Sequence, residues 1–167
     1  MVAAQTLSAE WWFYHIEQGS VDAAIAPLIE KCLERKWRVV VVGHEETIVR
    51  LDRSLWTFRE DSFLPHGRAR TDAAKHPVLL STEPVPANGA KVALLLDGSD
   101  ADPKTFDRIM VIFDGGDETA RAKARQQYKA ATDGGAAARY FQQERGGGWK
   151  ERTPAKKEAN SDANSTE

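Results

Sequence analysis

Four short and almost wholly apolar segments constrain the fold of this chain more than any other feature of its sequence. They read VVVV, VLL, VALLL and IMVIF and lie within residues 38–43, 77–80, 91–97 and 108–114. Apolar runs without polar alternation are typical of strands that are covered on both faces, as in parallel sheets. Segments with helical spacing separate several of these strands, which indicates βαβ units. The sequence therefore predicts an α/β fold with a largely parallel central sheet.

Residue spacing predicts the remaining strands and helices. We expect strands at residues 12–17, which are aromatic and apolar, and at 138–143, which we place at a sheet edge. Apolar side chains three and four residues apart predict helices over residues 20–36, 45–55 and 117–132. A short helix is also expected over 103–107. Gly134 and Gly135 should end the last long helix, because glycine readily adopts the left-handed conformation of a helix cap.

The chain is expected to form one domain between two terminal extensions. Its 167 residues suffice to bury a substantial core without a metal or a disulfide. We assign residues 11–150 to the α/β domain and residues 1–10 to a flexible N-terminal extension. Residues 151–167 contain no aromatic side chain and no aliphatic side chain larger than alanine, so burial cannot offset the entropy lost on ordering them. We therefore predict a disordered C-terminal tail.

Charge and composition exclude several classes of function. The chain has 23 basic and 25 acidic residues, so it lacks the basic surplus of a protein that binds nucleic acid over its whole surface. Cys32 is the only cysteine, which excludes an intramolecular disulfide and a multi-cysteine zinc site. The first residues lack the basic start and apolar run of a signal peptide, and no apolar run approaches the ~20 residues of a membrane span. We expect a cytoplasmic protein without a membrane partner.

The sequence contains no motif for catalysis or phosphate binding. Neither G-x-x-x-x-G-K-[ST] nor a G-x-G-x-x-G sequence after a strand is present, and the four histidines form no H-x-x-x-H pair. The turns after two predicted strands carry carboxylates, which would repel a phosphate. We therefore predict no catalytic residue, no cofactor and no metal site. One alternative stays open, an enzyme with a degenerate nucleotide pocket that uses Asp97, Asp114 and His66.

Residues 55–67 form the first of two candidate binding surfaces. Trp56, Phe58, Phe63 and Leu64 are large apolar residues in a segment that is otherwise polar and bent by a proline. Such residues either seal the end of a sheet or form an exposed patch for a partner. The residues alone favour neither interpretation.

The second candidate surface is a basic stripe on the helix predicted over 117–132. Arg121, Arg125 and Lys129 recur at every fourth residue and so lie along one side of the helix, with Tyr128 among them. Three cations around an aromatic ring suit an acidic peptide or a strand of phosphates. The same pattern also occurs on solvated helix faces, and direct binding of single-stranded DNA through this helix is a further alternative.

Several short motifs occur together in a defined order. They are FYH at 13–15, ERKWR at 34–38, LDRSLW at 51–56, DSFLPHG at 61–67, PVLL at 77–80, PANG at 86–89, VIFD at 111–114 and QYK at 127–129. The ordered set, over about residues 12–149, resembles the chi subunit of bacterial DNA polymerase III, an accessory subunit of the clamp-loader complex. The pair L-D-x-x-L-W and S-F-L-P-H-G is its most specific element.

This resemblance implies a single-domain Rossmann-like fold without a phosphate-binding loop, and a non-catalytic adaptor of DNA replication. Chi subunits bind the psi subunit of the clamp loader and the acidic C-terminal tail of single-stranded-DNA-binding protein, so their contact with DNA is indirect. By motif, Trp56 and Phe63 match the aromatic residues of the psi-facing surface, and Pro65 and His66 support the loop. The same surface in the family also engages a helicase-like repair protein.

The resemblance also gives the basic stripe a role. Arg125, Tyr128 and Lys129 match the family's tail-binding helix, and Arg121 matches a basic position there. An apolar pocket near Tyr128 is expected to take the aromatic residue of the tail. Residues 132–133, Thr and Asp, replace a more basic helix end, which is expected to weaken the tail site.

Overall fold

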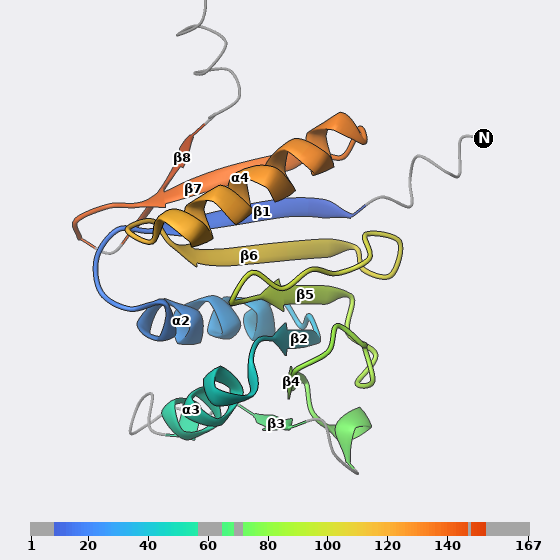
Figure 1. Cartoon of the computed structure of the whole chain (residues 1–167). Coiled ribbons are helices and arrows are strands. Elements are labelled where there is room, and N and C mark those ends of the chain that lie inside the picture. The colour runs from blue at the N-terminus through green and yellow to red at the C-terminus, as the bar shows by residue number, and fades with distance from the viewer. Residues whose placement is uncertain (1–8, 57–64, 69–71, 147, 153–167) are drawn as a thin grey trace, which may run out of the picture.

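The computed structural model describes residues 9–56, 65–68, 72–146 and 148–152, and its strands form one sheet (Figure 1). The strand order is β3-β4-β2-β5-β6-β1-β7-β8. The strands are β1 (Glu10–Ile16), β2 (Val39–Val42), β3 (His66–Arg68), β4 (Val78–Ser81), β5 (Val92–Leu95), β6 (Arg108–Asp114), β7 (Ala138–Gln143) and β8 (Trp149–Arg152). Every neighbouring pair is parallel except β7 and β8, which are antiparallel. The predicted mostly parallel α/β sheet is confirmed.

Helices cover both faces of the sheet and give the molecule three layers. On one face lie α2 (Val21–Glu34) and α3 (Glu45–Trp56), and on the other lies α4 (Glu118–Asp133). A single turn of 3-10 helix, Ala73–Lys75, precedes β4. The three long helices agree closely with their predicted bounds, and the arrangement fits the single-domain Rossmann-like fold.

The apolar runs form the buried centre of the sheet. Every residue of β2, β4 and β5 is buried, as expected for strands that are covered on both faces. In β1 the side chains alternate: Tyr14 and Ile16 pack toward α2, whereas Trp11 and Phe13 pack toward α4. One set of aromatic side chains therefore lies under α4 and another on the opposite face.

The end of α4 follows from its glycines, as predicted. Gly135 has a φ of +88°, a conformation that costs glycine little because it has no Cβ. Its N–H donates to the Thr132 carbonyl at 3.0 Å, and the Ala136 N–H donates to the Ala131 carbonyl at 2.9 Å. These two bonds are those of a Schellman motif. At the other end, the Asp117 carboxylate accepts from the first backbone N–H groups of the helix.

The prediction of a short helix over residues 103–107 is wrong, because this segment forms a turn. Its carbonyls bind the start of β1 instead of a following helical turn. Pro103 O accepts from the Ala9 N–H at 3.2 Å, and Asp107 O accepts from the Glu10 N–H at 3.0 Å. Phe106 is buried beneath this turn.

Two further strands depart from the sequence prediction. β3 has only three residues, too few for a recognisable period. β8 pairs with β7, so β7 is not at the sheet edge, and β8 includes two residues that we assigned to the disordered tail. Glu151 lies there because its carboxylate pairs with Arg139 at 2.8 Å and 3.0 Å. At the other end of the chain, Ala9 is buried and Glu10 begins β1, although both were assigned to the N-terminal extension.

Asn88 of the PANG motif joins the starts of several strands. Its side chain is buried, and its amide Nδ2 donates to the carbonyls of Val39 at 3.1 Å and His76 at 2.9 Å. Its Oδ1 accepts from the Ala90 N–H at 3.2 Å. The motif therefore has a structural role, because one side chain satisfies backbone groups that border β2, β4 and β5.

We expect Asn88→Ala to lower the free energy of unfolding by about 2–3 kcal/mol, because several backbone carbonyls and the Ala90 N–H each lose a hydrogen bond. Urea denaturation followed by circular dichroism measures this change. The control is Gln126→Ala, which removes an exposed amide from α4 and should leave stability within about 0.5 kcal/mol. Equal midpoints for the two variants would show that Asn88 does not fix these strands.

Candidate protein-binding sites

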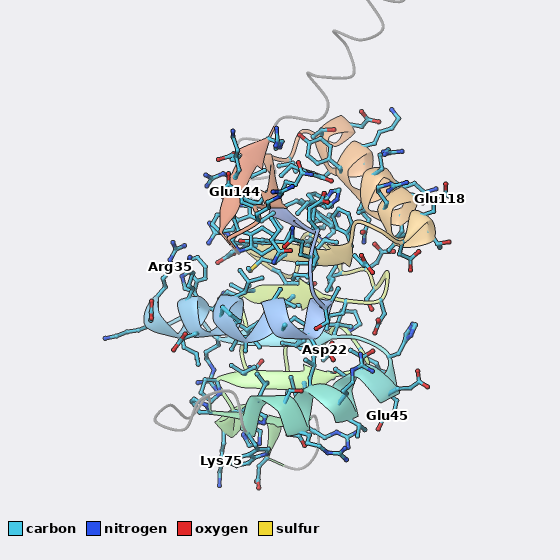
Figure 2. All side chains as sticks on the ribbon, turned by 90° about the vertical axis from the view of Figure 1, so that its left-hand side faces the viewer. Asp22, Arg35, Glu45, Lys75, Glu118 and Glu144 are labelled. Carbon is cyan, nitrogen blue, oxygen red and sulfur yellow. The ribbon has the colours of Figure 1, made fainter. Side chains whose placement is uncertain are left out.

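The two predicted binding surfaces lie at opposite ends of the sheet. α3 packs against β3 and β4 at one end, whereas α4 packs against β6, β1 and β7 toward the other. Figure 2 shows α3 and α4 separated by α2 and the middle strands. A partner at one end therefore does not occupy the surface of the other.

On α4, the three cations of the stripe differ in what they contact. Arg121 Nη1 donates to the Gly115 carbonyl at 2.8 Å, which holds its side chain at the start of the helix. Lys129 Nζ lies 3.1 Å from Asp133 Oδ2, so a carboxylate of the same helix already partners it. The exposed Arg125 guanidinium has no hydrogen bond or ion pair with any residue of the described part of the chain. Arg125 is therefore the member of the stripe that is open to an external carboxylate.

An apolar surface adjoins Arg125. Ala124, Gln127 and Ala131 bury one side of α4 against the sheet, so Tyr128 lies at the border between sheet and solvent. Its ring centroid is 5.4 Å from that of Phe13 and 6.3 Å from that of Tyr140. The stripe thus combines cations with half-buried aromatic rings. A separate pocket for the aromatic residue of a tail remains a prediction.

His15 and Tyr140, which the sequence did not associate with this surface, lie beside the stripe. His15 Nδ1 is 2.5 Å from the Tyr140 hydroxyl, and His15 Nε2 is 2.8 Å from Glu17 Oε2. Burial raises the pKa of Tyr140 to about 12, although Arg125 and Arg121 act in the opposite direction. Burial also lowers the pKa of His15, which Glu17 opposes. At neutral pH both rings are therefore uncharged, and the positive charge comes from α4.

At the other end of the sheet, the structure joins the two most specific motifs. The His66 side chain is fully buried, and its Nε2 lies 3.0 Å from Asp52 Oδ1 and 3.3 Å from the Asp52 carbonyl. Asp52 belongs to L-D-x-x-L-W and His66 to S-F-L-P-H-G. The pair ties strand β3 to α3. The Asp52 carboxylate was not predicted as the partner of His66, because the two residues are far apart in sequence.

Trp56, the last residue of α3, contacts the ring of His66. Its ring centroid is 5.2 Å from that of His66, and 57% of the residue is exposed. Pro65 precedes His66 and is half-buried. Phe63, like Phe58 and Leu64, lies outside the described residues. The surface therefore presents a large exposed indole ring beside buried His66, which pairs with the half-buried Asp52.

The structure does not bring together all three residues proposed for a degenerate nucleotide pocket. Asp97 and Asp114 line a cleft of about 510 Å³ at the carboxyl ends of β5 and β6, but His66 lies at the far edge of the sheet. Both carboxylates have structural partners: Asp97 accepts from the His44 N–H at 2.8 Å and Asp114 from the Gly116 N–H at 2.9 Å. Among the described residues, no group of three or more His, Cys, Asp or Glu side chains could hold a metal.

None of the helices in the described segments is both long and apolar enough to cross a membrane.

Comparison with known proteins gives two findings. The family model described as "DNA polymerase III chi subunit, HolC" matches residues 9–139. A protein of Rickettsia prowazekii (strain Madrid E), named "Probable DNA polymerase III subunit chi", is 29% identical over 113 residues, which cover 60% of this chain and 67% of the relative. The family match includes Trp56, His66 and the whole of α4.

Proposed function

The chain belongs to the DNA polymerase III chi subunit family, and on this premise we propose that it is a non-catalytic, cytoplasmic adaptor of DNA replication. In this proposal the α4 surface binds the acidic C-terminal tail of single-stranded-DNA-binding protein. The Trp56 surface binds the psi subunit of the clamp loader. The chain would thereby link the clamp loader to protein-coated single-stranded DNA without binding the DNA itself.

The observation that carries the proposal is the exposed Arg125, which has no polar partner among the described residues, beside the half-buried Tyr128. The expected tail ends in carboxylates, an aromatic residue and a free C-terminal carboxylate. A guanidinium group binds a carboxylate through two parallel hydrogen bonds, and such charge-assisted bonds are about twice as strong as neutral ones. Arg121 and Lys129 add positive potential that attracts the other acidic residues. The overall charge of −2 favours this local mode over broad binding to phosphates.

The Trp56 surface supports the psi part of the proposal. Exposed tryptophan rings dominate binding energy at many interfaces, and they do so best when the ring is held in one orientation. Contact with His66, which Asp52 fixes, supplies this orientation. A helicase-like repair protein would compete for the same surface.

Calorimetric titration at low salt with two short acidic peptides tests the function. One peptide ends in Phe and the other lacks this residue. We expect micromolar binding of the first and a loss of about tenfold or more for the second, because the truncation removes an aromatic contact and displaces the terminal carboxylate.

Two results would contradict the adaptor function at this site. One is the failure of both peptides to bind. The other is tight binding of a single-stranded oligonucleotide alone, lost on substitution of Arg125, which would favour a direct DNA binder.

A further inference from the structure

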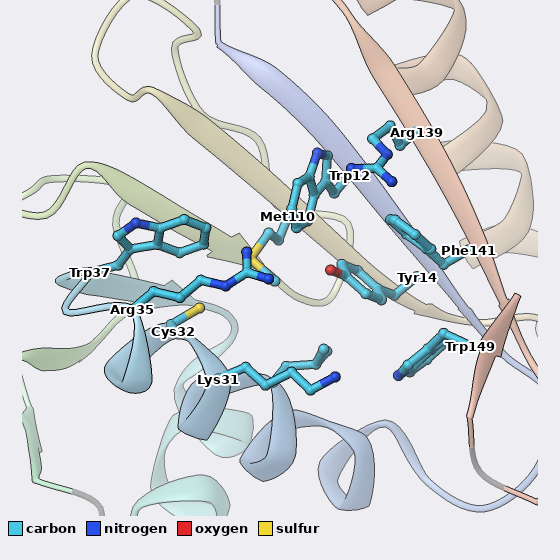
Figure 3. Close-up of a pocket in the computed structure, with 11 residues that line it drawn as sticks. Trp12, Tyr14, Lys31, Cys32, Arg35, Trp37, Met110, Arg139, Phe141 and Trp149 are labelled. Carbon is cyan, nitrogen blue, oxygen red and sulfur yellow. The ribbon is translucent and has the colours of Figure 1, made fainter. Parts of the chain in front are cut away.

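A cleft rich in aromatic side chains lies on the face of the sheet opposite α4 (Figure 3). We name it the aromatic cleft, and its aromatic lining consists of Trp12, Tyr14, Trp37, Phe141 and Trp149. We propose that the aromatic cleft is a further peptide-binding site. Its ligand would be an internal acidic segment of a partner protein, anchored by one large apolar side chain. This site goes beyond the proposed function, since neither α4 nor Trp56 contributes to it.

The shape of the cleft suits one apolar anchor. Its volume is about 220 Å³, below the roughly 300–1,000 Å³ of pockets that enclose whole small molecules. Leu28, Cys32 and Met110 line it together with the aromatic rings, and all three are buried. Burial raises the pKa of Cys32 to about 11, so its thiol stays uncharged and the surroundings remain apolar at neutral pH.

Positive charge at the rim of the cleft favours a negatively charged ligand. Lys31 of α2 and Arg35, the residue that caps the end of this helix, are exposed and line the cleft, and neither side chain has an ion pair or hydrogen bond within the described segments. The Arg35 guanidinium lies 5.0 Å from the centroid of the Trp37 ring. Figure 3 shows it directed toward Tyr14, across the cleft. Two cations without a carboxylate partner in the described segments thus face an apolar cavity, which complements an apolar residue flanked by Asp or Glu.

The other cations of this face already have carboxylate partners, which leaves Lys31 and Arg35 for a ligand. Arg108 pairs with Glu10 at 3.2 Å, and Arg139 pairs with Glu151 at 2.8 Å. Both guanidinium groups lie over the Trp12 ring, at 4.2 Å and 5.2 Å from its centroid. They fix the aromatic lining and contribute little net charge.

The chemistry of the lining favours a peptide over a nucleobase. Among the described residues, no carboxylate or carboxamide side chain lines the cleft, so the donor groups on the edge of a base would find few acceptors. Guanidinium groups already lie over Trp12 and Trp37, which limits the ring surface left for base stacking. Tryptophan, tyrosine, methionine and arginine are also the residues enriched in protein–protein interfaces.

The test uses a peptide of alternating Asp and Glu with one central Phe, acetylated at its N-terminus and amidated at its C-terminus. Without a free terminal carboxylate, it lacks one of the groups that the proposed α4 site is expected to bind. Calorimetry with the full chain at low salt should show binding that weakens about tenfold or more when Phe is replaced by Ala. The double variant Lys31→Glu with Arg35→Glu should weaken it by at least as much.

Two controls separate this site from other effects. Arg53→Glu with Lys104→Glu changes the net charge equally at exposed positions away from the cleft and should preserve binding. Arg125→Ala should also preserve it, so failure of the tail site and failure of the cleft give different results. The proposal is overturned if the peptide does not bind, if the Ala peptide binds equally, or if the Lys31/Arg35 variant binds normally. Binding of oligothymidylate that this variant abolishes would overturn it in favour of a nucleic-acid site.

Discussion

Replacing Arg125 with alanine is expected to weaken binding of a Phe-terminated acidic peptide by about 2 kcal/mol or more, which is a loss of roughly thirtyfold. The guanidinium is exposed and is the stripe cation without a polar partner in the described part of the chain. Its removal leaves the carboxylate of the peptide without its two-pronged donor and should not disturb the fold. Calorimetry at low salt measures the loss.

The loss of affinity in Arg125→Ala can be compared with the losses in other single variants. Lys129→Ala should cost less than Arg125→Ala, because the Lys129 ammonium already pairs with Asp133. Arg53→Ala is the matched control, since it removes an exposed arginine from α3 at the other end of the sheet. If Arg125→Ala binds the peptide as tightly as Arg53→Ala does, the assignment of the tail site to α4 is wrong.

Replacing Trp56 with alanine is expected to weaken binding of the psi subunit by about 2–4 kcal/mol, the range for an aromatic residue at the centre of an interface. Because 57% of Trp56 is exposed in the free chain, most of its contact surface is available to a partner. Surface plasmon resonance with immobilised psi measures the change in affinity, and thermal unfolding confirms that the variant remains folded.

Val85→Ala is the control for Trp56→Ala. Val85 is another exposed apolar residue, with 52% of its surface accessible, and it lies outside the two proposed surfaces. This variant should bind psi normally. Unchanged binding by Trp56→Ala, with correct folding, would move the psi site elsewhere on the molecule. An equal loss in both variants would indicate a general effect of reduced surface hydrophobicity.

The sequence predicted those parts of the fold in which local pattern and global burial agree. β2, β4 and β5 consist of Val, Leu and Ala apart from Ser81 at the end of β4, and they are buried on both faces, so their apolar composition identifies them. Gly134 and Gly135 allowed the end of α4 to be predicted. The basic stripe was also visible, since spacing in a helix fixes which residues share a side.

The features that the sequence did not predict depend on contacts between segments that are distant in the sequence. β8 is polar and short, and it pairs with β7 because Trp149 packs on Tyr14 and Glu151 binds Arg139. Asp52 could not be recognised as the partner of His66 until α3 and β3 were placed side by side. The aromatic cleft has the same origin, because its residues come from β1, α2, the segment between α2 and β2, β6, β7 and β8. Residue spacing within one segment cannot predict a cleft that is built from several distant segments.

Simultaneous binding of both proposed partners tests the adaptor account most directly. Sedimentation velocity with a fluorescent Phe-terminated acidic peptide, the full chain and an excess of psi shows whether one complex holds all three. Since the two surfaces lie at opposite ends of the sheet, we predict that the peptide sediments with the chain–psi complex and that psi does not change its affinity. Displacement of the peptide by psi would contradict the account, because a chain that binds its partners only in turn cannot link them.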